Sequence, residues 1–171
     1  MWLLKFAYEK INGKPAPYYY NYSLLTIICK PIRKFVVNVI APNCPFNNIR
    51  IFLYRLCGFE IGKNVFIGMH SYLDDMCYDL MKIGNNVTIS YGVYFACHGK
   101  NQGHYPIIIE DGAYIGMRSS IISKNANACS GEGVTIGNKA IVGACALVNV
   151  DVPPNAIAVG IPCKIIRGGI R

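Results

Sequence analysis

The residues of this chain best suited to move a proton near neutral pH are its three histidines, because the unperturbed imidazole pKa is about 6.5. His98 stands in the segment Tyr-Phe-Ala-Cys-His-Gly-Lys, and His104 follows it in the same segment between two hydrophobic runs. An imidazole at such a position can act as a general base or bind zinc. His70 falls at an expected turn, where we predict a structural role.

Carboxylates and a thiol accompany the histidines. Asp74 and Asp75 lie in the segment Tyr-Leu-Asp-Asp-Met-Cys-Tyr-Asp. Aspartate in a loop commonly accepts hydrogen bonds from its own backbone, but these two could also bind substrate hydroxyl groups or orient a histidine. Cys97 invites a nucleophilic mechanism because it adjoins His98. Neighbouring residues of an extended chain point to opposite faces, which makes that pairing unfavourable.

The composition indicates one compact domain. Of 171 residues, 53% are hydrophobic and 15% are charged, which excludes a disordered chain and allows a sizeable core. The eight cysteines contain no CxxC pair and are expected to be buried thiols of a cytoplasmic protein. Charges at Lys5, Glu9 and Lys10 argue against a signal peptide, and no uncharged apolar run approaches the roughly 20 residues that a bilayer crossing requires.

Positive charge is concentrated near the start of the chain. Residues 1–60 contain eight lysines or arginines and two glutamates, which gives +6 of the net charge of +8. This asymmetry predicts a basic region over 1–60, a different region over 61–167 and a short tail over 168–171.

An aliphatic or phenylalanine residue returns every six positions in four runs. The twelve members are Ile61, Ile67, Leu73, Ile83, Ile89, Phe95, Ile109, Ile115, Ile121, Ile136, Val142 and Val148. A period of six fits neither an α-helix nor a simple alternating strand. It predicts a solenoid of short strands and turns, in which three units make one coil and residues eighteen apart stack. Glycine after many of these aliphatics indicates turns with unusual dihedral angles or close backbone approach.

The period is interrupted at three places, over 74–82, 96–108 and 123–135. The extra residues must leave the coil as loops. Loops on a rigid scaffold commonly carry binding and catalysis, so we expect the functional site among them.

The repeats carry a family resemblance. The segments Ile-Gly-Lys-Asn-Val-Phe-Ile-Gly and Val-Thr-Ile-Gly-Asn-Lys-Ala-Ile-Val-Gly-Ala, with the closing Asp-Val-Pro-Pro-Asn-Ala-Ile-Ala-Val-Gly-Ile-Pro-Cys-Lys-Ile-Ile-Arg, are similar to the hexapeptide-repeat acyltransferases. The likeness covers about residues 61–167 and is greatest to the sugar and polysaccharide O-acetyltransferases. It implies an all-β solenoid of left-handed parallel β-helix type, a homotrimer and acetyl-CoA as co-substrate.

The resemblance also implies roles for single residues. His98 matches the catalytic base, while His104, Asp74 and Asp75 are expected to bind the acceptor or assist the base. Positions matching the coenzyme A contacts of the family are Gly116, Met117, Ala144, Lys164 and Arg167. Relatives carry Thr-Lys where this chain has Asn149 and Val150, so Lys124 or Lys139 would have to replace that phosphate contact.

Two amphipathic helices are predicted in the basic region. The first begins at Pro31 with an apolar stripe from Ile32 to Ile40, and the second follows Asn47 or Asn48 and ends at Gly58. The apolar stripe expected for the second helix is Ile49, Phe52, Leu53 and Leu56. These helices either cap the first coil or dock on the cytoplasmic face of an anionic membrane as a peripheral attachment.

Three functions remain open. The first is acetyl-CoA-dependent transfer of an acetyl group to a hydroxyl of a sugar or lipid-linked saccharide, with no metal and no acyl-enzyme. The second is a zinc lyase resembling the γ-type carbonic anhydrases, in which three histidines activate water. The third is a non-catalytic trimeric scaffold. Nucleic acid is not an expected partner, because no recognised binding motif accompanies the charge.

Overall fold

The computed structural model of the chain describes residues 2–13, 24–98, 104–123 and 133–166. It contains two compact units, Met1–Phe35 and Val36–Arg171. The described part of the first unit consists of two helices, α1 (Trp2–Asn12) and α2 (Leu24–Phe35). We predicted that a helix would begin at Pro31, but α2 begins seven residues earlier and holds Pro31 in its interior.

The second unit opens with three helices, η2 (Val36–Ile40, a π-helix), α3 (Ala41–Asn43) and α4 (Asn47–Leu56). The apolar stripe predicted over this segment does not coincide with the buried face of η2. Val37 is fully buried, whereas Val39 and Ile40 are exposed. A π-helix bonds each residue to one five positions away, so its inward face departs from the 3.6-residue period on which the prediction rested.

The second predicted helix exists, and its end near Gly58, where φ is +100°, is confirmed. Its apolar stripe does not face the coil. The buried residues of α4 are Arg50, Ile51 and Tyr54, and Leu53 is partly buried, while the rest of the predicted stripe, Ile49, Phe52 and Leu56, is exposed. Hydrogen bonding explains this orientation. The helix packs on the open edge of the first coil, where backbone carbonyl groups need donors.

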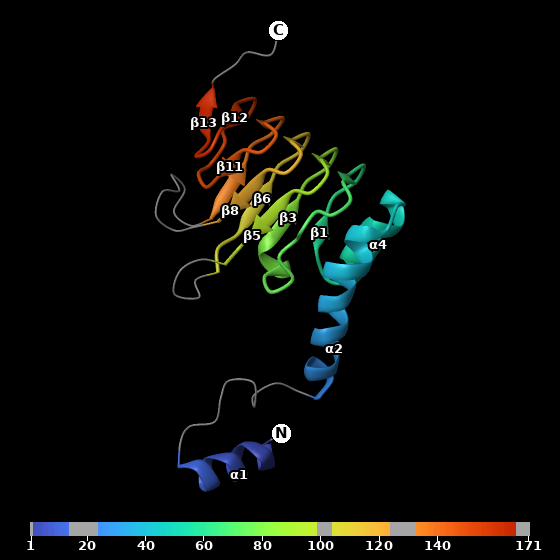
Figure 1. Ribbon diagram of the computed structural model, residues 1–171, viewed down its shortest axis with the longest axis vertical. Coiled ribbons are helices and arrows are strands. Elements are labelled where there is room, and N and C mark those ends of the chain that lie inside the picture. The colour runs from blue at the N-terminus through green and yellow to red at the C-terminus, as the bar shows by residue number, and fades with distance from the viewer. Residues whose placement is uncertain (1, 14–23, 99–103, 124–132, 167–171) are drawn as a thin grey trace. The chain divides into compact units, whose positions relative to one another are not determined.

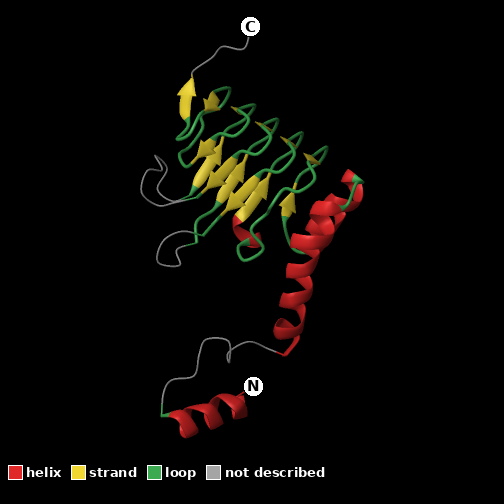
Figure 2. Ribbon diagram, in the orientation of Figure 1, coloured by secondary structure: helices red, strands yellow, loops and turns green. Residues whose placement is uncertain are grey.

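Thirteen short strands follow in the described chain and form three sheets (Figures 1 and 2). The first sheet has the order β1-β3-β6-β9, the second β13-β12-β10-β7-β4-β2 and the third β11-β8-β5. All pairings between named strands are parallel except that of β12 with β13. The chain visits the three sheets in turn, which makes a three-sided parallel coil.

The bounds of the strands and of one short helix are β1 Glu60–Ile61, β2 Phe66–Ile67, η3 Tyr78–Leu80, β3 Met81–Ile83, β4 Thr88–Ile89, β5 Tyr94–Ala96, β6 Ile107–Ile109, β7 Tyr114–Ile115, β8 Ser120–Ile122, β9 Val134–Ile136, β10 Ile141–Val142, β11 Leu147–Val148, β12 Ile157–Val159 and β13 Lys164–Ile166.

The repeat aliphatics form the core of the coil. Ile61 pairs with Ile83, Ile83 with Ile109, and Ile109 with Ile136. Eleven of the twelve repeat positions are buried, and Ile61 is partly buried at the first rung. The predicted stacking distance of eighteen residues is wrong. These pairs are 22, 26 and 27 residues apart because each of these three coils carries an insertion.

The glycine that follows an aliphatic allows close backbone approach. A Cβ at Gly62 would clash with the backbone of Gly84 in the next coil, and one at Gly68 would clash with Ser90. Neither glycine has a positive φ, so close approach is the reason for the residue type. His70 lies at a corner with φ of +56°, which confirms its turn position.

All three insertions leave the coil along the same edge, between the third sheet and the next strand of the first (Figure 1). The first begins after Leu73, the second after β5 and the third after β8. A single edge of the coil therefore carries every inserted loop, and this edge positions the candidate site.

Candidate active site

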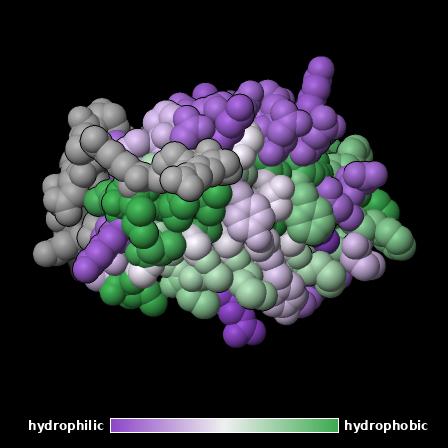
Figure 3. All heavy atoms as spheres, turned by 90° about the horizontal axis from the view of Figure 1, so that it is seen from above, coloured by the Kyte–Doolittle hydropathy of each residue, from purple (hydrophilic) through white to green (hydrophobic). Residues whose placement is uncertain are grey.

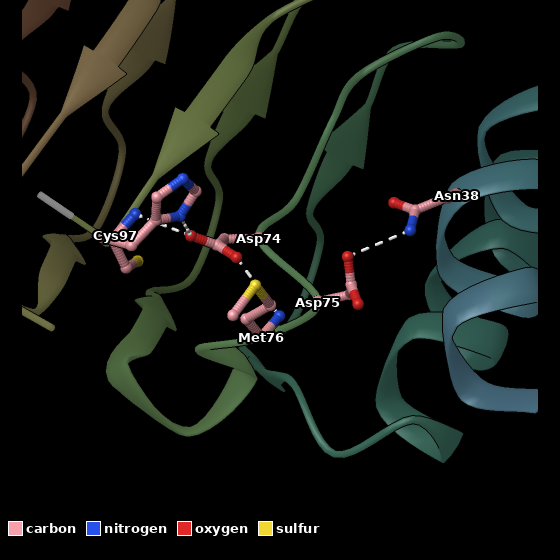
Figure 4. Close-up of polar contacts among 6 residues, drawn as sticks. Asn38, Asp74, Asp75, Met76 and Cys97 are labelled. Atoms are coloured by element: carbon pink, nitrogen blue, oxygen red, sulfur yellow. Dashed lines mark hydrogen bonds and ion pairs between the residues drawn. The ribbon is translucent and has the colours of Figure 1, made fainter. Parts of the chain in front are cut away.

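A carboxylate and an imidazole meet at the start of the first two insertions. Asp74 Oδ2 lies 2.6 Å from His98 Nδ1 (Figure 4). The residues are 24 positions apart, but Tyr72 bridges to Tyr94 in the third sheet, so the residues that follow these two strands emerge side by side. The coil itself thus creates the contact.

The carboxylate of Asp74 is fully buried and well supplied with donors. Its Oδ2 also accepts the backbone N–H of Cys97 at 2.9 Å, and its Oδ1 accepts the N–H of Met76 at 3.1 Å. A carboxylate held in this way accepts a hydrogen bond from the N–H at Nδ1 of His98, which leaves Nε2 with its lone pair. The His98 side chain is 42% exposed and can therefore meet a substrate.

The two histidines of the second insertion are also brought together. His98 and His104 form an antiparallel bridge, and the N–H of Tyr105 donates to the carbonyl of Cys97 at 2.7 Å. His104 is exposed, and its backbone lies beside that of His98. That it helps to hold a substrate stays a prediction.

Asp75 has a different neighbour from Asp74. Its Oδ1 accepts a hydrogen bond of 3.0 Å from Nδ2 of Asn38 on η2, and Asp75 is buried (Figure 4). Sequence reasoning missed Asn38 as part of the site. The available signal was one amide in the otherwise apolar run Val-Val-Asn-Val-Ile, at a π-helix, a feature that is frequent at functional sites.

The thiols near the pair are unsuited to nucleophilic attack. Cys97 is fully buried, and its pKa is raised by burial first and by the neighbouring Asp74 second. Burial and the same carboxylate raise the pKa of Cys77 to about 11. The expectation that the cysteines are buried is wrong for two others. Cys29 is exposed on α2, and Cys145 is exposed at a corner where φ is +57°.

Two tyrosine rings lie next to the pair on the outer face of the third sheet. Tyr72 and Tyr94 stack with centroids 4.6 Å apart and an interplanar angle of 12°. Burial, followed by the charges of Asp74 and Asp75, raises the pKa of Tyr72, so its hydroxyl remains protonated. The rings offer a flat apolar surface with hydroxyl groups.

Three of the residues expected to contact coenzyme A line one pocket. Gly116, Met117 and Ala144 share it with Phe66, Ser90, Tyr91 and Tyr114, and its volume is about 410 Å³. Gly116 lies before β8 and His98 lies after β5, and these two strands are paired in the third sheet. The pocket and the pair therefore lie at opposite ends of strands of three residues, each of which spans about 10 Å.

The remaining expected contacts are distributed differently. Lys164 is exposed on β13, and Lys139 is exposed at a corner with φ of +54°. Arg167 and Lys124 lie outside the described residues. A larger hollow of about 680 Å³ lies along the first sheet, around the ion pair of Lys82 with Glu60 at 3.2 Å, and does not include the histidines.

Within the part of the chain that the structure describes, no three histidine, cysteine, aspartate or glutamate side chains converge as metal ligands would. The described helices are all too short or too polar to cross a bilayer.

Comparisons with known proteins agree with the coil. Residues 106–148 match a family model described as the hexapeptide repeat of succinyl-transferase. A galactoside O-acetyltransferase of Escherichia coli K12 is 32% identical over 126 residues, which cover 64% of this chain and 56% of that protein. The chain thus spans little more than half the length of this curated relative.

Solved structures share the fold. A hexapeptide-repeat acetyltransferase of Vibrio cholerae has a TM-score of 0.59 and 22% identity over 85% of this chain and 93% of its own. A maltose O-acetyltransferase of Clostridium difficile 630 has a TM-score of 0.57 and 24% identity over 92% of this chain and 94% of its own. The repeat and the three-sided coil agree with these findings, so the chain is similar to the hexapeptide-repeat acetyltransferases and shares their fold.

Proposed function

We propose that this protein transfers an acetyl group from acetyl-CoA to a hydroxyl group of a sugar or lipid-linked saccharide. The observation that carries the proposal is the 2.6 Å contact between His98 and Asp74 at the loop-bearing edge of a hexapeptide coil. The coil is proposed to wind left-handed, as in the family, and the enzyme to act in the cytoplasm.

The pair acts as a base with a fixed tautomer. Asp74 holds the proton of His98 on Nδ1, so Nε2 takes the proton of the acceptor hydroxyl as its oxygen attacks the thioester carbonyl. The carbon–sulfur bond then breaks, and the protonated imidazole returns its proton to the departing thiolate of coenzyme A. The products are an acetyl ester and free coenzyme A, without an acyl-enzyme.

Acetyl-CoA supplies the activated acetyl group. The pocket formed by Gly116, Met117 and Ala144 suits an uncharged, extended chain such as pantetheine. Lys164 and Arg167 would bind phosphate groups through charge-assisted hydrogen bonds. Support comes from the Vibrio cholerae relative, which has also been solved complexed with acetyl coenzyme A, at a TM-score of 0.55 to this chain.

A saccharide suits the surface beside the base. The stacked rings of Tyr72 and Tyr94 offer an apolar platform to a sugar face, while the exposed His104 offers a polar group to its hydroxyls. Asp75, which was also expected to bind the acceptor, is buried and bonded to Asn38. The galactoside and maltose O-acetyltransferases are named for saccharide acceptors.

The active enzyme is proposed to be a homotrimer with each site completed by a neighbouring subunit. The pocket is open on one side, and its rim residues Phe66, Tyr91, Tyr114 and Met117 are between 44% and 50% exposed. Hydrophobic patches are visible on the face drawn in Figure 3, where hydrophilic side chains gather along one rim. A second subunit would cover such surface.

A thiol-release assay tests the proposal. Purified protein is incubated with acetyl-CoA and a panel of galactosides, maltose, other saccharides and serine, and free coenzyme A is measured. We expect release above the hydrolysis background with at least one saccharide. Release with serine alone would contradict the sugar assignment, and no release with any hydroxyl acceptor would contradict the transferase itself.

A further inference from the structure

Asp75 is a buried carboxylate that takes no part in the proposed chemistry. It is 8% exposed, and its Oδ1 accepts a hydrogen bond of 3.0 Å from Nδ2 of Asn38. An ionised carboxylate taken out of water needs such a donor, because its lost hydration is otherwise uncompensated. The amide of Asn38 therefore holds the side chain of Asp75 in place.

Two consecutive residues make contacts on opposite sides of the chain. Asp74 reaches His98 on one side, and Asp75 reaches Asn38 of η2 on the other (Figure 4). Because the two aspartates share a peptide unit, a backbone rotation that releases Asp75 also displaces Asp74. The position of the carboxylate that holds His98 thus depends on the contact made by its neighbour.

The residues around Asn38 give its amide a firm support. The preceding residue, Val37, is fully buried in the core. Both α3 and α4 pack against η2, and the N–H of His70 in the first coil donates to the carbonyl of Pro42 on α3 at 2.8 Å. These contacts attach η2 to the coil, so Asn38 is a fixed point to which the Asp75 segment is tied.

The carbonyl oxygen of Asn38 shows that the carboxylate decides how this amide is turned. Its Oδ1 is buried and, among the residues that the structure describes, has no hydrogen-bond partner. Turning the amide over would place that oxygen against Oδ1 of Asp75, so that two acceptors faced each other. The contact with Asp75 is therefore kept although it leaves a buried acceptor unsatisfied, which destabilises the fold. Such a local loss of stability is typical of functional sites.

We propose that Asn38 is a positioning residue of the active site. It holds the segment of Asp74 and Asp75 so that Asp74 keeps the proton of His98 on Nδ1, and it touches no reacting atom itself. The helical segment before the coil thereby contributes to the site. The effect of Asn38 on turnover rests on the proposed function, whereas its effect on the tautomer of His98 does not.

An exchange of the two side chains tests the contact. Asn38→Asp keeps the shape of the side chain but sets one carboxylate against another, so the segment should shift. Asp75→Asn keeps an acceptor for Nδ2 of Asn38 and should be tolerated, because the proposal gives the charge of Asp75 no role. In the double variant Asn38→Asp with Asp75→Asn, the hydrogen bond can form in the reverse direction. Asn48→Asp, at an exposed asparagine in the first turn of α4, adds the same charge as a control.

Two properties of the full chain are measured at pH 8. Long-range proton–nitrogen NMR spectra of the histidine rings, in which His98 is assigned from the spectrum of His98→Ala, show which ring nitrogen carries the proton. Coenzyme A release gives kcat and the KM for acetyl-CoA. We expect Asn38→Asp to show a mixture of the two tautomers and a kcat about ten- to a hundredfold lower with little change in KM, since a small misplacement of a catalytic group has effects of this size. Asp75→Asn, the double variant and the control should keep the proton on Nδ1 and near wild-type turnover.

The outcomes separate the inference from the proposed function. If Asn38→Asp does not fold, Asn38→Ala removes the donor without adding charge and carries the same expectations. A folded variant at this position that keeps the Nδ1 tautomer and full turnover would overturn the inference and leave the proposed function standing. Asp75→Asn with as large a loss, and no recovery in the double variant, would also overturn it, because Asp75 would then act through its charge. If the wild type releases no coenzyme A, the proposed function fails, and the tautomer comparison still decides the inference.

Discussion

A carboxylate with no exposed surface, Asp74, determines which nitrogen of His98 carries a proton. Burial makes this acceptor strong, because no water competes for it, and the N–H groups of Cys97 and Met76 hold it in place. In the proposed mechanism the aspartate therefore positions the base, and the substrate meets the imidazole.

Replacement of Asp74 by Asn isolates this role. The new amide can donate to Nδ1 of His98 and thereby place the imidazole proton on Nε2, the atom that must accept the hydroxyl proton. We expect the Asp74→Asn variant to lose about 10²- to 10⁴-fold in kcat with a small change in the KM for acetyl-CoA. Asp79→Asn, at an exposed site in the same insertion, is the control. Equal activity of the two variants would refute the role of Asp74.

The thiol of Cys77 gives a pH dependence of stability. Its pKa is raised from 9.0 to about 11 in the folded chain, so the unfolded chain loses this proton first as the pH rises. The stabilising contribution is complete below pH 9 and is lost between about pH 9 and 11. Urea unfolding at pH 8 and pH 10.5 should therefore show a larger alkaline loss in the wild type than in Cys77→Ala. Identical losses would argue against the burial of this thiol.

At the scale of the element, the packing of α4 on the coil depends on the buried guanidinium group of Arg50. Arg50→Met keeps the bulk of the side chain but leaves the carbonyls of Ile67 and Cys44 without their donor. We expect a loss of about 3 kcal/mol in the free energy of unfolding, because each orphaned buried group costs about 1–3 kcal/mol. Arg55→Met on the exposed side of the same helix should cost about 1 kcal/mol or less. Urea midpoints measure both, and equal losses would contradict the inward role of Arg50.

The elements also show what the sequence could predict. The repeat aliphatics, their strands and the three insertions follow from side-chain size at a fixed period, and these were confirmed. The orientation of α4 could not be predicted, because a stripe of Ile49, Phe52 and Leu56 says nothing of where unpaired carbonyls lie. The contact of Asp74 with His98 depends on which residues lie side by side after an insertion. These two residues are 24 positions apart, so the regular period of eighteen does not predict their contact.

At the scale of the whole molecule, the open pocket lined by Gly116, Met117 and Ala144 predicts assembly. We expect sedimentation equilibrium to give three times the chain mass of 18.9 kDa at micromolar concentration. Tyr114→Glu at the exposed pocket rim should shift the mass toward the monomer, because a charge would be buried against the neighbour. A stable wild-type monomer with full activity would contradict the shared site.

The central claim for the molecule is that His98 is the base of an acetyl transfer to a hydroxyl group. The most direct measurement is the rate of coenzyme A release by His98→Ala at saturating acetyl-CoA and acceptor. His70→Asn, at a corner where φ is +56° and asparagine is well tolerated, serves as the control. The account predicts a fall of roughly 10²- to 10⁴-fold for His98→Ala and wild-type turnover for His70→Asn. Wild-type turnover by His98→Ala would contradict it.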